Sequence, residues 1–200
     1  MAADDSTGGL HLRVQEGTLL AAGPDMLDPN FMHRVVLLCR HTEEGAYGLV
    51  VNRPSELSTR DVFAAHPVLG AQGAPDFPVF IGGPVGLDTL QVLHRVPAHI
   101  DGGLEIAAGI HVGGDLEQVA RYLTAEPAAA RANLRLALGY SGWAGGQLEA
   151  ELAQSAWLPA PPDAELVFGA DGDSVWRRVV RSIGESAEGL AEQPPDPEWN

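Results

Sequence analysis

Apolar and polar positions follow two different periods along this chain, and the change of period predicts where strands and helices lie. Residues 34–40 form a nearly uninterrupted run of branched aliphatic side chains, as in a strand covered on both faces. A second apolar run at 46–51 follows after the polar segment 41–45. The spacing of these two runs predicts a β-hairpin.

Several shorter segments extend the predicted pattern. Strands are expected at 17–22, 79–81, 90–94, 105–107, 110–112, 134–138 and 164–168. Helices are expected at 59–64, at 116–123 with Asp115 as the N-cap, at 148–156, and in the segment that ends at Ile183. Residues 126–131 are expected to form a turn or a short helix. The prolines of 157–162 form a proline stop that ends the helix before them. Because the early strands are joined by short turns, part of the sheet must be antiparallel, and the predicted fold class is α+β.

The distribution of these segments predicts one domain. We expect a single domain at 13–183, a flexible tail at 1–12, and an acidic, proline-containing tail at 184–200. No internal repeat is apparent.

Charge and composition exclude several classes of protein. The net charge is -15, all 12 basic residues are arginine, and the absence of lysine excludes Schiff-base chemistry and a P-loop lysine. Strong acidity also argues against direct nucleic-acid binding, which depends on clustered cations. The single cysteine, Cys39, excludes a disulfide within the chain. No apolar run approaches the roughly 18 residues of a membrane span, and we expect a cytoplasmic protein that does not contact a membrane.

Possible catalytic patterns are incomplete. Ser141 lies in a strand–turn–helix segment like a nucleophile elbow, but Trp143 occupies the position where that turn needs glycine. The histidines lack the short spacings of a metal site, so no metal is expected. Arg53, at the end of a buried strand, can bind a carboxylate or phosphate, or can pair with a structural acid such as Asp115.

Several segments in order along the chain resemble the AlgH/YqgE family (UPF0301, DUF179). They are 17–24, 28–31, 35–38, 45–54, 79–85, 93–94, 113–115 and 139–149. The resemblance implies a mixed, mostly antiparallel sheet curled into a pseudo-barrel with helices packed outside. It implies no assigned reaction and no cofactor. The family name comes from a proposed role in regulating alginate synthesis, and we expect any regulatory role here to be indirect.

The leading hypothesis is a non-catalytic binding or indirect regulatory domain whose partner is a small molecule or a protein. The candidate ligand-binding residues are Asn52, Arg53, Gly83, His94, Asp115 and Trp143. Two alternatives stay open. One is an enzyme of unfamiliar, hydrolase-like type that uses His94 with a carboxylate such as Asp115. The other is a structural protein that binds a partner through an exposed apolar patch.

Overall fold

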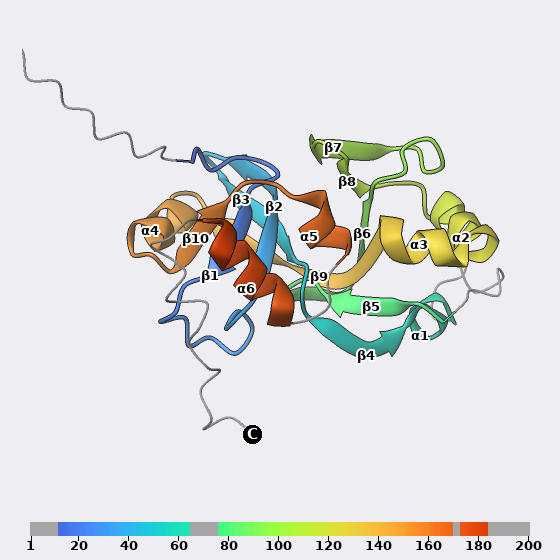
Figure 1. The fold of residues 1–200 in the computed structure, drawn as a ribbon, viewed down its shortest axis with the longest axis horizontal. Coiled ribbons are helices and arrows are strands. Elements are labelled where there is room, and N and C mark those ends of the chain that lie inside the picture. Colours follow the sequence, from blue (N-terminus) through green and yellow to red (C-terminus); the bar gives the residue numbers. More distant parts are fainter. Residues whose placement is uncertain (1–11, 65–75, 170–172, 184–200) are drawn as a thin grey trace, which may run out of the picture.

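Strand β9 (Leu134–Ala144) is the element around which the sheet is built in this computed structural model (Figure 1). Its first half pairs in parallel with β5 (Pro78–Ile81) and antiparallel with β6 (Val85–His94). Its second half pairs antiparallel with β3 (Gly45–Val50). The structure describes residues 12–64, 76–169 and 173–183.

The strands form one mixed, mostly antiparallel sheet. The remaining strands are β1 (Leu19–Ala22), β2 (Val35–Thr42), β4 (Pro54–Ser58), β7 (Gly103–Ala107), β8 (Ile110–Gly113) and β10 (Trp157–Ala160). Within the described residues the sheet has ten strands. Eight follow the order β10-β1-β2-β3-β9-β6-β8-β7; of the other two, β5 pairs with β9, and β4 pairs with β5. The α+β prediction is confirmed, and the sheet does not close into a barrel.

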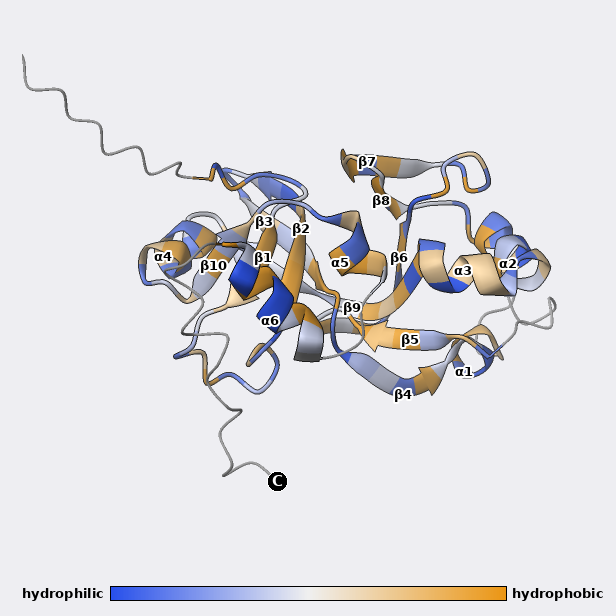
Figure 2. Ribbon diagram, viewed as in Figure 1, coloured by the Kyte–Doolittle hydropathy of each residue, from blue (hydrophilic) through white to orange (hydrophobic). Residues whose placement is uncertain are grey.

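Short helices cover this sheet on both sides. They are α1 (Thr59–Ala64), α2 (Leu116–Ala125), α3 (Pro127–Asn133), α4 (Gln147–Ala153), α5 (Ala164–Phe168) and α6 (Asp173–Ser182). Helix α6 lies in front of β1 and β2, α5 lies between α6 and α3, α4 lies at one end, and α2 and α3 lie at the other (Figure 1). Apolar residues follow the strands and polar residues mark the outer side of α6 (Figure 2). None of the described helices is long and apolar enough to cross a membrane.

Strand β2 is buried on both faces, as its uninterrupted apolar run predicts. Val35 and Leu37 belong to the core beneath α5 and α6. Val36 and Leu38 face the opposite side and pack into the cluster that contains Trp157. The side chains on both faces of β2 are therefore buried inside the protein.

Some predicted elements are wrong. Residues 164–168 form helix α5, because the Asp163 side chain accepts hydrogen bonds from the backbone N–H groups of Glu165 and Leu166 and caps the helix. The predicted proline stop contains β10, which pairs with β1. Proline is tolerated there because β10 is an edge strand. Nearly all of the predicted tail 1–12, and the whole of 184–200, lie outside the described residues.

Two segments meet at a contact that we call the glycine crossing, formed by Gly82 and Gly83 against Gly139 and Tyr140. A Cβ atom on Gly83 would lie 2.1 Å from the carbonyl carbon of Tyr140, and one on Gly139 would lie 2.6 Å from the Gly83 oxygen. The Gly82 N–H donates to the Leu138 oxygen at 2.8 Å. Only glycine permits backbones to approach so closely.

The Gly82 carbonyl ties the crossing to β3. It accepts a hydrogen bond from the Val50 N–H at 2.8 Å and one from the Ser141 hydroxyl at 3.3 Å. Ser141 is fully buried and its hydroxyl donates to a backbone carbonyl. The hydroxyl is therefore not exposed to solvent as that of a nucleophile would be. The crossing thus joins β3, β5 and β9 through backbone contacts.

Gly139→Ala should lower the free energy of unfolding by at least about 3 kcal/mol, because the new methyl group meets two backbone oxygens. Gly109→Ala is the matched control. Its φ is 72°, against 71° for Gly139, but a methyl group there enters open space. The control should lose only about 1–2 kcal/mol, from the left-handed backbone alone. Equal losses in urea unfolding would show that the crossing imposes no steric constraint.

Candidate functional site

A cavity of about 360 Å³ opens between α3, α5 and β5. We call it the arginine cavity. It is lined by Phe77, Pro78, Phe80, Ala128, Arg131, Ala132, Leu134, Arg135, Phe168 and Gly169. The helices α3 and α5 stand side by side in front of this part of the sheet (Figure 1).

Arg135 is the buried charge of this cavity. It lies on β9, in the middle of the sheet, and only 5% of its surface is exposed. Its guanidinium lies over the Phe80 ring, 4.1 Å from the ring centroid. A planar guanidinium stacks well on an aromatic face, which lowers the cost of burying the charge.

Arg131 provides a second, more exposed guanidinium from α3. It lies over the Phe77 ring at 5.8 Å and donates a hydrogen bond to the Asp76 carbonyl oxygen at 3.0 Å. The helix therefore presents this cation at the rim, while β9 presents Arg135 inside.

The wall formed by α5 is held in place by Arg95, at the end of β6. Arg95 pairs with Glu165 of α5 and donates to the Asn133 side chain at 2.9 Å. It also lies 5.6 Å from the centroid of Phe168, the aromatic residue that α5 contributes to the cavity. The ion pair and the ring contact fix α5 beside α3.

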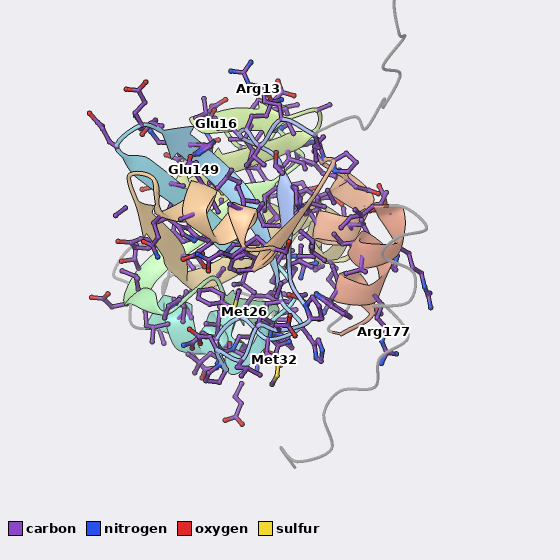
Figure 3. All side chains as sticks on the ribbon, turned by 90° about the vertical axis from the view of Figure 1, so that its left-hand side faces the viewer. Arg13, Glu16, Met26, Met32, Glu149 and Arg177 are labelled. Carbon is purple, nitrogen blue, oxygen red and sulfur yellow. The ribbon has the colours of Figure 1, made fainter. Side chains whose placement is uncertain are left out.

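The charge of the arginine cavity contrasts with that of the chain. Among the described residues that line it are two arginines and no acidic side chain, although the protein carries a net charge of -15. Two other hollows mix both signs: one combines Arg13 with Glu16 (Figure 3), and another combines Arg121 with Asp101 and Glu126. Fixed cations on low-dielectric walls concentrate positive potential, so the arginine cavity is suited to an anion.

The described part of the cavity lining offers no nucleophile or general base. It consists of apolar residues, glycine and arginine. Arginine stays protonated at any pH a protein tolerates. The one cysteine, Cys39, lies elsewhere in the core, where burial raises the pKa of its thiol to about 12.

None of the six residues singled out from the sequence lines this cavity. Asn52 follows β3 and is buried against the start of β2, where its side chain accepts from the Val35 N–H at 2.9 Å and donates to the His33 oxygen at 2.9 Å. Arg53 donates to the Asn30 side chain at 3.3 Å. Gly83 belongs to the glycine crossing.

His94 and Asp115 do not form a hydrogen-bonded pair among the described residues. His94 is fully buried opposite His111, with the two rings stacked at a centroid distance of 5.1 Å. The Asp115 carboxylate caps α2 by accepting from the Gln118 N–H at 2.9 Å. Within the described residues, no three His, Cys, Asp or Glu side chains gather as metal ligands would.

Trp143 belongs to an aromatic cluster beneath α4. Its indole N–H donates to Glu151 at 2.8 Å, and the indole of Trp157 donates to the same carboxylate oxygen at 2.7 Å. The two rings meet edge to face at 5.8 Å. This contact supports the core, and a ligand-binding role for any of the six residues stays a prediction.

The sequence contained one signal for the arginine cavity. Arg135 interrupts the apolar strand 134–138, and a charge within a buried strand marks a specific environment. The three phenylalanines carry no such signal, because Phe168 lies far along the chain from Phe77 and Phe80.

Comparison with known proteins shows extensive similarity. A DUF179 family model, described as AlgH-like, matches residues 19–188. A UPF0301 protein of Chlorobaculum tepidum is 37% identical over 94% of this chain and 96% of its own length. One from Paracoccus denitrificans is 39% identical over 84% of this chain and 89% of its own.

Solved structures agree. The solution structure of the AlgH protein from Pseudomonas aeruginosa superposes with a TM-score of 0.69 and 30% identity, covering 98% of this chain and 99% of the other. A Corynebacterium diphtheriae protein shares the fold, with a TM-score of 0.70 and 23% identity. The match covers 91% of this chain and 93% of the other.

The buried imidazole of His94 should make stability depend on pH. Burial, and then repulsion from His111, lower its pKa from 6.5 to about 4. The unfolded chain therefore takes up a proton first as the pH falls, so stability present above about 6.5 is lost toward pH 4. We expect a loss of at most about 3 kcal/mol from this group in urea titrations.

The variant His94→Gln isolates this effect from the other groups that titrate in the same range. Subtracting its stability curve from that of the natural chain should leave a difference that declines between pH 6.5 and 4. A difference that does not change with pH would contradict the prediction.

Proposed function

The chain belongs to the AlgH-like (DUF179, UPF0301) family, and from this premise we propose that it is a non-catalytic domain that binds a small anion. The observation that carries the proposal is the arginine cavity, where the described lining residues include two arginines and no acidic side chain. Its volume of about 360 Å³ lies near the lower end of the range for small-molecule pockets, about 300–1,000 Å³. The ligand is therefore small.

The electrostatics of the chain support selective uptake at this place. An anion approaching a protein of net charge -15 is repelled by most of its surface. Inside the arginine cavity the charged side chains among the described lining residues are both positive, Arg131 and Arg135, and Arg135 is held in a largely buried position on a rigid strand. Preorganised cations bind an anion without the entropy cost of ordering long side chains.

The alternative functions receive less support. An enzyme based on His94 and Asp115 needs the two side chains to cooperate, and they serve separate structural contacts. A purely structural partner-binding protein would need a large exposed apolar patch. Large exposed apolar side chains such as Leu27 and Leu104 lie on separate elements.

We also propose that any regulatory effect is indirect. Ligand binding would act through α3 and α5, which both contact the cavity. We propose as well that the protein is cytoplasmic and does not contact nucleic acid directly.

A thermal-shift screen of small carboxylates and phosphates tests this function. A ligand at 100 times its Kd adds about 2.7 kcal/mol to stability, which is seen as a rise in Tm. In Arg131→Gln the same compound should bind about tenfold more weakly, because one charge-assisted contact is lost. Arg177→Gln is the charge-matched control, since Arg177 is exposed on α6 and does not line the cavity (Figure 3).

The control variant should respond as the natural chain does. If no anion raises the Tm, or if both variants weaken binding equally, the arginine cavity is not the site.

A further inference from the structure

We infer that the buried pair His94–His111 is a pH-sensitive joint, which releases the hairpin β7–β8 from the rest of the sheet under mildly acidic conditions. Neither histidine lines the arginine cavity. Three features support this role: the burial of the two imidazoles, the packing of the hairpin over one of them, and the narrow attachment of the hairpin to β6.

The surroundings of His94 accommodate the neutral ring and not the cation. Its Nδ1 accepts a hydrogen bond from the Val96 N–H at 3.4 Å, so the proton of the neutral ring lies on Nε2. Among the described residues, Nε2 has no hydrogen-bond partner. A second proton would add to Nδ1 and cancel the bond from Val96, which would leave a buried cation with two N–H groups that lack an acceptor.

The hairpin itself covers His94. A Cβ atom on Gly103, the first residue of β7, would lie 2.3 Å from His94 Nε2, so the glycine backbone lies directly against the ring. A Cβ atom on Gly114, just after β8, would lie 3.5 Å from the same nitrogen. The cation of His94 therefore gains water on this side when β7 moves away.

His111 adds a second imidazole to the same joint. It lies on β8 directly opposite His94, with ring centroids 5.1 Å apart, and its Nδ1 is also buried without a hydrogen-bond partner among the described residues. Burial, and then repulsion from His111, lower the pKa of His94 to about 4. When the joint opens, the ordinary pKa of 6.5 returns, so acid favours the open state.

The acidic side chains around the pair are engaged elsewhere. Glu105 of β7 lies in register with His111, but its carboxylate accepts from a backbone N–H of the hairpin turn at 3.3 Å. Asp101 accepts from the Gln118 side chain, and Asp115 accepts from the Gln118 N–H, each at 2.9 Å. Among the described residues, none of these carboxylates is hydrogen-bonded to either ring.

The cations on the neighbouring elements are also placed away from the pair. Arg95 is held by an ion pair with α5, and His99 by a ring contact with α2. Arg135 follows the β9 residue that lies opposite His94, so its side chain lies on the other face of the sheet. The titration of the joint is therefore governed by His94 and His111.

The attachment of the hairpin to the sheet is narrow. Within the described residues β8 pairs with β6 at two positions, Leu93 with Val112 and His94 with His111. Strand β7 follows β8 at the edge of the sheet (Figure 1). Two buried isoleucines of the hairpin hold it against the core while both rings are neutral. Charge on the histidine pair acts on half of the joint.

Hydrogen exchange of the full chain, followed residue by residue by NMR, tests the joint. After correction for the intrinsic exchange rate, the amides that bond β6 to β8 should show an open population that rises about tenfold between pH 7.5 and pH 5.5. At each pH these amides should open at least about fivefold more often than those of β2 and β3, because release of the hairpin is a partial opening.

Variants assign the rise to the pair. His94→Gln should abolish it, because glutamine does not titrate in this range. His99→Gln is the matched control, since His99 is exposed on a neighbouring segment, and the rise should stay at about tenfold. His111→Gln should reduce the rise without abolishing it, because the like charge is lost while the burial of His94 remains.

Because the His94→Gln chain can fail to fold, the unmodified chain decides the test. A rise of less than about threefold at the amides between β6 and β8 would overturn the inference. Protection of these amides equal to that of β2 and β3 at both pH values would also overturn it, since the hairpin would then open only by global unfolding.

Discussion

The close backbone contact of Gly82 and Gly83 with Gly139 and Tyr140 is the constraint on which the rest of the structure depends. It sets β5 parallel to the first half of β9, with Phe80 opposite Ala137. Residues two apart on a strand share a face, so Arg135 lies on the same side as Ala137 and beside the ring of Phe80. The crossing therefore determines where the buried guanidinium of the arginine cavity is placed.

The residues by which the family is recognised serve mainly this scaffold. Gly83 keeps two backbones in contact, Asn52 ties β2 to the segment after β3, and Trp143 shares the Glu151 carboxylate with a second indole. By contrast, Arg131 and Arg135 lie outside the segments that carry the resemblance. The two arginines on which the proposed anion binding depends are therefore different residues from those by which the family is recognised.

The sequence predicted the fold well and the arginine cavity poorly, for physical reasons. Local periodicity was sufficient for the doubly buried strand at 34–40 and for the Asp115 cap. It failed at 164–168, where the cap supplied by Asp163 outweighs a β-like composition. The cavity depends on the parallel register of β5 with β9, a long-range pairing that local pattern does not encode.

A crystal structure of the chain grown with a saturating small anion that raises the Tm would test the central claim most directly. The account predicts the anion in the arginine cavity, within hydrogen-bond distance of the Arg131 guanidinium. The anion bound at another place on the molecule, with the arginine cavity holding only solvent at saturation, would contradict it.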